Sequence, residues 1–231
     1  MKTIGLIGGM SWESTAEYYR IVNETVKREA GGLHSAKCVL YSVDFHEVEA
    51  LQREGRWDEL DGLMADAGLR LSRAGAAFIV ICTNTMHVSA PVVERETGLP
   101  VLHIADVAGA SARERGLSRL GLLGTRFTME GSFYTAVLSN RFGIDVIVPE
   151  PAERETVHRI IYEELCLGVV KEASRRAYLE VIEGLGKRGA QGVVLGCTEI
   201  PLLVKQEHVE LPVLDTTRLH AEAAARKALE P

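Results

Sequence analysis

Two cysteines in this chain follow short apolar runs and precede threonine. The two copies of this pattern, 78–85 and 192–199, each contain a β-branched apolar run, then Cys-Thr, then a side chain that can hydrogen-bond. Such a run is typical of a strand buried on both faces. Ligands of open α/β sheets bind at the carboxyl ends of the strands. The pattern therefore predicts that Cys82 and Cys197 are a pair of reactive thiols at two strand ends.

Two matched thiols suit proton transfer at the α-carbon of an amino acid. One group removes the proton from one face of that carbon, and its partner donates a proton to the opposite face. A free thiol has a pKa of about 8.5, and neighbouring hydrogen-bond donors or a helix N-terminus lower it. Polar neighbours of this kind follow both cysteines and are candidate substrate-binding residues: Thr83, Asn84, Thr85, Thr198 and Glu199.

The elements that would carry these thiols occur twice along the chain. Apolar runs near 4–7, 37–43, 78–81 and 99–102 predict strands, and runs near 120–124, 144–148, 192–196 and 211–214 repeat them. Helical spacing lies between them, with a capping box at 14–17 predicting a helix start near Ser14. Gly8 and Cys82 are 74 positions apart, and Gly124 and Cys197 are 73 apart. Near-equal offsets predict two copies of one α/β unit.

We therefore predict two similar α/β lobes with parallel sheets, related by a pseudo-twofold axis, with the active site in the cleft between them. The first lobe is expected to comprise 1–104 together with 213–231, and the second 105–212. Such an axis would bring the two thiols face to face across the cleft.

Composition and charge limit the classes of partner that the chain is expected to bind. The formal net charge of the 231 residues is -6 and no basic stripe is present, which argues against nucleic acid as a partner. No apolar run approaches the about 20 residues of a membrane helix, so no membrane partner is expected. The four cysteines lie far apart and no export signal is evident, which favours reduced thiols and a cytoplasmic location. No phosphate-binding, dinucleotide or zinc motif is complete, so no cofactor and no metal ion are expected.

Four segments together resemble the aspartate/glutamate racemase family: 8–15, 82–87, 124–129 and 196–200. The likeness extends over essentially the whole chain, including 163–168. It implies a racemase that needs no pyridoxal phosphate or other cofactor. It also implies two flavodoxin-like lobes, an active site between them, an amino-acid substrate and a homodimer.

The resemblance also implies roles for individual residues. Cys82 and Cys197 would be the acid–base pair. The residues that would surround the α-carboxylate and amino group of the substrate are Met10, Asn84, Thr85, Thr125, Thr198 and Glu199. Gln52 and Cys166 stand where aspartate-selective members are expected to carry basic residues. A second carboxylate would lack a charged partner there, so the expected substrate range is broad or shifted toward glutamate or neutral polar amino acids.

Two other readings remain open from the sequence. One is a cysteine-dependent malonate decarboxylase or maleate isomerase on the same scaffold. The other is a two-lobed protein that binds a small acid without turnover. Retention of both thiols favours racemisation, because delivery of a single proton needs only one.

Overall fold

The computed structural model describes residues 1–231, and these form two compact units. Unit 1 comprises Met1–His103 and His220–Pro231, and unit 2 comprises Ile104–Leu219. Residues 213–219, which the sequence analysis assigned to the first lobe, lie in unit 2. The reason is that their strand pairs with the strand that carries Cys197.

Unit 1 is built on three parallel strands in the order β2-β1-β3. The strands are β1 (Ile4–Gly8), β2 (Cys38–Ser42) and β3 (Phe78–Ile81). The helices are α1 (Trp12–Ala30), α2 (Phe45–Glu54), α3 (Trp57–Arg73), the short 3₁₀ helix η1 (Thr85–Ser89), α4 (Ala90–Thr97) and most of α11 (Thr216–Leu229). The strand expected at 99–102 is reduced to a single parallel bridge between Ile79 and Val101.

Unit 2 has four parallel strands in the order β5-β4-β6-β7. The strands are β4 (Arg119–Gly124), β5 (Asp145–Ile147), β6 (Gly192–Gly196) and β7 (Val213–Asp215). The helices are α5 (Ile104–Glu114), α6 (Arg126–Glu130), α7 (Ser132–Phe142), α8 (Pro151–Glu163), η2 (Leu165–Leu167), α9 (Glu172–Lys187), α10 (Ile200–Leu203) and η3 (Gln206–His208). The predicted α/β class with two parallel sheets is confirmed, and the order β2-β1-β3 in unit 1 corresponds to β5-β4-β6 in unit 2.

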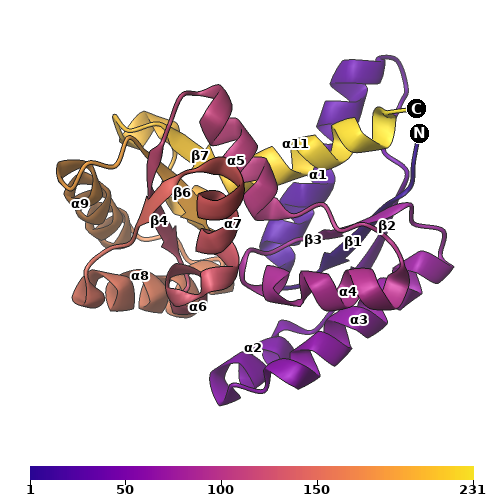
Figure 1. Cartoon of the computed structure of the whole chain (residues 1–231), viewed down its shortest axis with the longest axis horizontal. Coiled ribbons are helices and arrows are strands. Elements are labelled where there is room, and N and C mark those ends of the chain that lie inside the picture. Colours follow the sequence, from indigo (N-terminus) through magenta and orange to yellow (C-terminus); the bar gives the residue numbers. More distant parts are fainter. The chain divides into compact units, whose positions relative to one another are not determined.

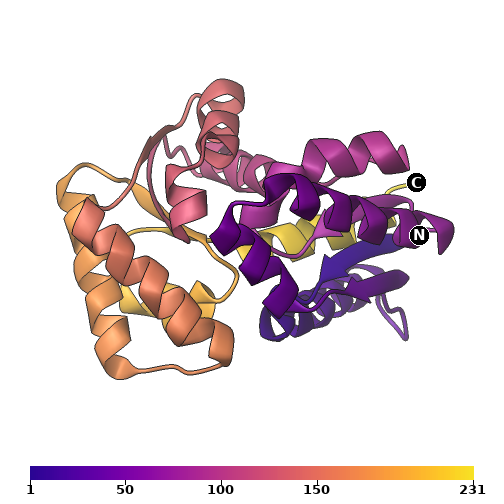
Figure 2. The same ribbon diagram turned by 90° about the horizontal axis from the view of Figure 1, so that it is seen from below.

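Helices cover both faces of each sheet, which explains the continuous apolar runs of the central strands. In unit 1, α1 and α11 pack on the face that includes Ile4 and Phe78, whereas α3 and α4 pack on the face that includes Ile7 and Ile79. Figure 1 shows α1 and α11 together on one side of β1–β3, and Figure 2 shows the same layers from below. In unit 2, α8 and α9 cover one face and α5 and α7 the other.

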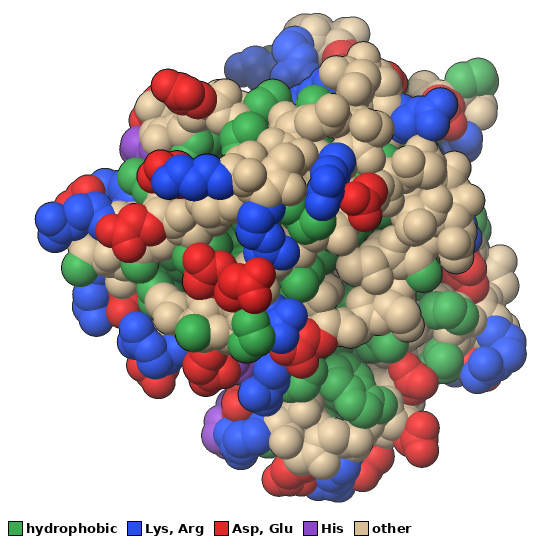
Figure 3. Space-filling model, turned by 60° about the vertical axis from the view of Figure 1, so that its left-hand side comes forward, with side chains coloured by type: hydrophobic (Ala, Val, Ile, Leu, Met, Phe, Trp, Pro, Cys, Tyr) green, Lys and Arg blue, Asp and Glu red, His purple; other side chains and the backbone are tan.

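Charged side chains lie mainly on the outer helix surfaces. On the face shown in Figure 3, acidic and basic side chains are interspersed, without an extended area of one sign. Many form ion pairs within one helix, such as Arg20 with Glu17 and Glu24 on α1. Exposed pairs of this kind contribute about 1 kcal/mol or less.

No helix of the chain is both long and apolar enough to span a bilayer.

Candidate functional site

Cys82 lies at the carboxyl end of β3, the strand next to β1. Its backbone N–H donates to the carbonyl of Ile7 at 2.9 Å, so the parallel ladder continues to this residue. The side chain is completely buried. It packs on the sheet face that α1 and α11 cover. The ladder and the surrounding core therefore fix the position of the Cys82 backbone.

The turn after Cys82 holds three of the predicted substrate-binding residues. Asn84 and Thr85 are buried and Thr83 is half-buried. The 3₁₀ helix η1 begins at Thr85, and the N–H of His87 donates to the carbonyl of Asn84 at 3.1 Å. The structure thus brings Thr83, Asn84 and Thr85 together with Cys82.

Met10 lies in the loop that joins β1 to α1, beside the same end of the sheet. The loop needs glycine: Gly9 has φ +93°, and a Cβ there would lie 2.2 Å from the carbonyl oxygen of Val43. The N–H of Gly9 donates to Thr15 Oγ1 at 2.9 Å. Helix α1 begins at Trp12 with Ser11 as its N-cap, so the predicted start near Ser14 is wrong. The hydroxyl of Ser14, the predicted cap, donates to the Ser11 carbonyl at 3.3 Å from within the helix.

Gln52 is buried on α2, and its Nε2 donates to Met86 Sδ at 3.2 Å. Met86 belongs to η1, so Gln52 contacts the turn that follows Cys82. Met10 and Met86 also share one core cluster. The predicted residues of unit 1 therefore gather at the carboxyl ends of β1 and β3.

Unit 2 has the corresponding arrangement at the ends of β4 and β6, which are adjacent strands. Thr125 follows β4 and is the N-cap of α6, where its Oγ1 accepts from the Thr128 N–H at 3.3 Å. Its hydroxyl also lies 3.3 Å from that of Thr128. Thr125 is buried at this position.

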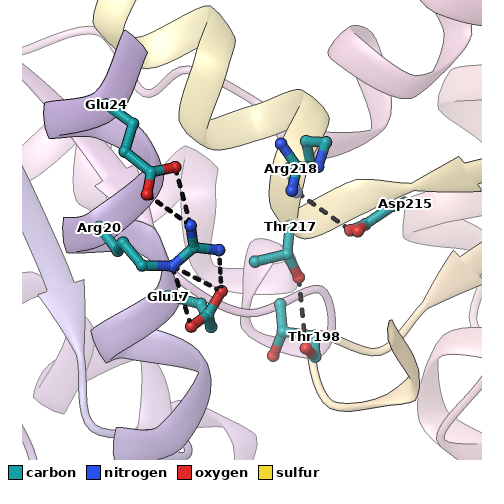
Figure 4. A network of polar contacts seen from close by, with 7 residues as sticks. All are labelled: Glu17, Arg20, Glu24, Thr198, Asp215, Thr217 and Arg218. Atoms are coloured by element: carbon teal, nitrogen blue, oxygen red, sulfur yellow. Dashed lines mark hydrogen bonds and ion pairs between the residues drawn. The ribbon is translucent and has the colours of Figure 1, made fainter. Parts of the chain in front are cut away.

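Cys197, Thr198 and Glu199 form a hydrogen-bonded cluster just after β6. The thiol of Cys197 donates to Glu199 Oε2 at 2.8 Å, and the Thr198 hydroxyl donates to Glu199 Oε1 at 3.0 Å. All three residues are buried. Thr217 Oγ1 donates to the Thr198 carbonyl at 3.3 Å, as Figure 4 shows. The carboxylate of Glu199 is thus held by the hydroxyl and the thiol beside it.

Both thiols are protonated in this environment. Burial raises the pKa of Cys82, and Cys38 adds to the effect. Burial also raises the pKa of Cys197, and the charge of Glu199 and the proximity of Cys166 raise it further. Low-dielectric surroundings disfavour a thiolate. A ligand with positive charge would have the opposite effect.

The internal repeat is offset by one residue at the cysteines. In unit 1 the strand register pairs Ile7 with Ile81, so the ladder sets Cys82 opposite Gly8. In unit 2 the register pairs Gly124 with Gly196, and Cys197 lies one residue beyond.

Because of this offset, the two thiols point to non-equivalent faces of their respective sheets. Cys82 lies on the face of its sheet that is covered by the helix following the first strand of the unit. Cys197 lies on the α8 and α9 face, whereas α7, the longer of the two helices between β4 and β5, is on the other face. A shift of one residue turns a side chain to the opposite face of a sheet. The expectation that the two cysteines occupy equivalent positions in register is therefore corrected.

Sequence reasoning missed several polar residues that pack beside these turns. Thr216 Oγ1 donates to the Leu195 carbonyl at 2.7 Å, next to Cys197. Tyr18 and His220 lie in the buried layer beside Cys82. Thr216 and Thr217 directly follow the strand at 213–215, so their place after an apolar run was the available signal. Tyr18 and His220 gave no signal, because they are 202 positions apart.

Unit 1 offers a thiol, hydroxyls and an amide, and unit 2 offers a thiol, hydroxyls and a carboxylate; groups of these kinds can move protons and bind a polar small molecule. No three His, Cys, Asp or Glu side chains come together in a way that could hold a metal ion.

Comparisons with known proteins show the family to which the chain belongs. The sequence model of the Asp/Glu/hydantoin racemase family matches residues 7–224. A Yersinia pestis protein assigned as an Asp/Glu racemase has 54% sequence identity and a TM-score of 0.92, with 100% of both chains covered. An aspartate racemase homologue from Pyrococcus horikoshii OT3 has 34% identity and a TM-score of 0.83, again over 100% of both chains.

Among curated proteins, the broad specificity amino-acid racemase RacX of Bacillus subtilis (strain 168) is 18% identical over 232 residues, which is 95% of each chain. The predicted racemase resemblance and the prediction of an isomerase are confirmed by these matches. The decarboxylase, maleate isomerase and binding-protein alternatives are not favoured.

Proposed function

Because the chain belongs to the Asp/Glu/hydantoin racemase family, we propose that it interconverts the L and D forms of an amino acid without a cofactor. Cys82 and Cys197 are the acid–base pair in this proposal. One observation carries it: each of the two units has a buried Cys-Thr at the carboxyl end of a central parallel strand, among hydrogen-bonding side chains.

The reaction needs one thiolate and one thiol at the α-carbon. The thiolate takes the α-proton from one face, and the thiol on the opposite face donates its proton to the carbanion. The C–H bond breaks at one sulfur and a new C–H bond forms from the other, so the two groups exchange protonation states in each turnover. The reverse direction uses the same groups in exchanged roles.

The substrate itself helps to form the thiolate. Burial raises the pKa of both cysteines, so an empty site holds thiols. An amino acid brings an ammonium group, and an opposite charge within about 4–6 Å lowers a pKa by about 1–3 units. Asn84, Thr85, Thr125 and Thr198 supply hydrogen bonds for the carboxylate, and charge on the carbanion is stabilised by the same donors.

Glu199 makes the two thiols unequal. Its Oε2 accepts the hydrogen bond of the Cys197 thiol at 2.8 Å. The sulfur of Cys82 lies 3.9 Å from a backbone carbonyl oxygen, that of Val80. In this proposal Glu199 directs the proton of Cys197 and attracts the substrate ammonium, which makes Cys197 the proton donor in the resting enzyme.

The substrate range is broad in this proposal. Gln52 is neutral and is bonded to Met86, so it offers no charge to a second carboxylate. Cys166 packs beside the core cluster of Cys197 and also carries no positive charge. Glutamate and neutral polar amino acids are therefore proposed as substrates beside aspartate.

We also propose that the enzyme is a homodimer in the cytoplasm. None of its four cysteines is in a disulfide, as expected for a reducing compartment. Sedimentation at several concentrations tests the dimer.

The deciding experiment uses a panel of L-amino acids in deuterated water, without added pyridoxal phosphate or metal. The parental enzyme should produce the D enantiomer with deuterium at the α-carbon. Cys82→Ser and Cys197→Ser should each lose more than about a thousandfold in kcat, because a hydroxyl is a far weaker acid–base group at neutral pH. Cys38→Ser is the matched control and should keep parental activity. A near-parental rate in either active-site variant would exclude the two-thiol mechanism.

A further inference from the structure

A buried hydrogen-bonded network lies in the layer that covers Cys82. The hydroxyl of Tyr18 is 2.8 Å from Nδ1 of His220, and Nε2 of His220 is 2.7 Å from the carbonyl oxygen of Leu102. Tyr18 and His220 are completely buried. The network therefore joins α1, α11 and the segment after α4 within unit 1.

The network continues to the turn that carries Cys82. The ring of His87 packs edge-on against that of His220 with centroids 5.5 Å apart, and against that of His103 at 4.7 Å. Nδ1 of His87 is 2.7 Å from the carbonyl oxygen of Thr83. Thr83 directly follows Cys82, so the last bond of the network is made to the neighbour of the thiol.

The partners define which nitrogen carries each proton. A carbonyl oxygen only accepts, so Nε2 of His220 donates to Leu102 and Nδ1 of His87 donates to Thr83. Nδ1 of His220 then accepts from the Tyr18 hydroxyl. Burial lowers the pKa of both rings, and contact with His103 lowers it further, so both are neutral at pH 7. Each ring thus has one defined orientation.

We propose that Tyr18, His220 and His87 are positioning residues that hold the turn of Cys82 in the geometry needed for proton transfer. The role in catalysis rests on the proposed function of Cys82. Tyr18 orients His220, His220 packs against and orients His87, and His87 holds the Thr83 carbonyl.

A plain apolar core would fill this space without the cost of burying polar groups. Each of these groups costs about 1–3 kcal/mol when it is buried without a partner. Here the two rings bond to the carbonyl of Thr83, in the Cys82 turn, and to that of Leu102, in the segment beside β3. Hydrogen bonds fix the orientation of the two histidine rings, because each bond has a preferred direction. Apolar packing alone would fix the ring orientation less strictly.

Unit 2 holds its turn by a different means. The Leu195 and Thr198 carbonyls, on either side of Cys197, accept from the hydroxyls of Thr216 and Thr217. A substitution can therefore destabilise the Cys82 turn without affecting the Cys197 turn, or the reverse. In each experiment the unaffected turn serves as the internal reference.

The first test measures amide hydrogen exchange in Tyr18→Phe, which removes one hydroxyl and keeps the ring. Loss of one buried hydrogen bond weakens local stability by about 1 kcal/mol, so amides of the 82–87 turn should exchange about fivefold faster. The turn at 197–200 should be unchanged. Tyr134→Phe is the matched control, because the Tyr134 hydroxyl is buried and has no hydrogen-bond partner. Equal acceleration in both turns, or none beyond the control, would overturn the proposal.

The second test measures primary deuterium isotope effects with α-deuterated L and D substrates. In Tyr18→Phe and His220→Gln the isotope effect should rise for the enantiomer whose hydrogen Cys82 removes, and stay parental for the other. A structural role alone would change both enantiomers equally, and that result would overturn the proposal. If the parental chain racemises nothing, the proposed function fails, whereas the exchange measurements still decide whether the network holds the turn.

Discussion

Acidification should unfold unit 1 through its buried histidines. Burial lowers the pKa of His220 to about 4 from its ordinary 6.5, with the Leu102 carbonyl opposing this and His103 adding to it. The unfolded chain therefore binds a proton at His220 below about pH 6.5, whereas the folded chain does so only near pH 4. Stability is complete above 6.5 and is lost as the pH falls from 6.5 to about 4.

The size of the stability loss follows from the pH interval between the unfolded and the folded pKa of His220. At pH 5, about 1.5 units below the unfolded value, the loss from His220 is about 2 kcal/mol at 1.36 kcal/mol per unit. The pKa of His87 is lowered well below its ordinary value by burial and then by its contacts with His103 and His220. It adds a further loss in the same direction. The loss from His220 alone, about 2 kcal/mol, is already a large part of the stability of a typical domain.

Urea unfolding followed by tryptophan fluorescence measures this loss in the relevant unit. The two tryptophans, Trp12 and Trp57, are both in unit 1, and Trp57 packs against a core cluster there. The free energy of unfolding is measured at about pH 7 and about pH 5, and the difference between the two is the result.

Substitution of His220 shows how much of the stability loss on acidification comes from this one histidine. His220→Gln lowers stability at both pH values, but its loss between them should be smaller than the parental loss by about 2 kcal/mol. His34→Gln is the control, because His34 is exposed and should leave the parental loss unchanged. An identical loss in His220→Gln and the parental chain would refute the reasoning.

Two further changes test the turns around the site. Gly9→Ala should destabilise the chain by about 2–5 kcal/mol, measured by urea unfolding, because a Cβ meets the Val43 carbonyl at a positive φ. Gly75→Ala has a similar φ in open space, and a loss as large as that of Gly9→Ala would contradict the steric explanation. Thr216→Val should cost about 1–2 kcal/mol in thermal unfolding followed by circular dichroism, since it removes the bond to the Leu195 carbonyl. Thr156→Val serves as its comparison, because the half-buried Thr156 donates an exposed bond to the Ala152 carbonyl; equal losses in the two would argue against a role for burial.

The fold class could be predicted because it depends on local patterns. Buried parallel strands read as apolar runs, and helices between them read as amphipathic segments. The repeat of these patterns predicted two copies of one unit, and β2-β1-β3 in unit 1 corresponds to β5-β4-β6 in unit 2. The strand at 99–102 was overestimated, because its pairing is limited to one bridge and depends on tertiary packing.

The candidate site was predictable where a residue directly follows a strand. Such positions after a strand are occupied by Cys82, Asn84, Thr85, Thr125, Cys197, Thr198 and Glu199. Gln52 lies on a helix, and its partner Met86 is 34 positions away in the sequence. No local sequence pattern predicts a contact at that separation.

The sequence by itself determined the alternation of elements, the two Cys-Thr turns and the polar residues that follow them, since these depend on neighbours along the chain. Tertiary structure alone decided the face on which each thiol packs, because one residue of strand register separates the two outcomes. It also decided the contact of Tyr18, His87 and His220, which come from three distant segments. Long-range packing brings such residues together, and its energy depends on the whole core rather than on any one stretch of sequence.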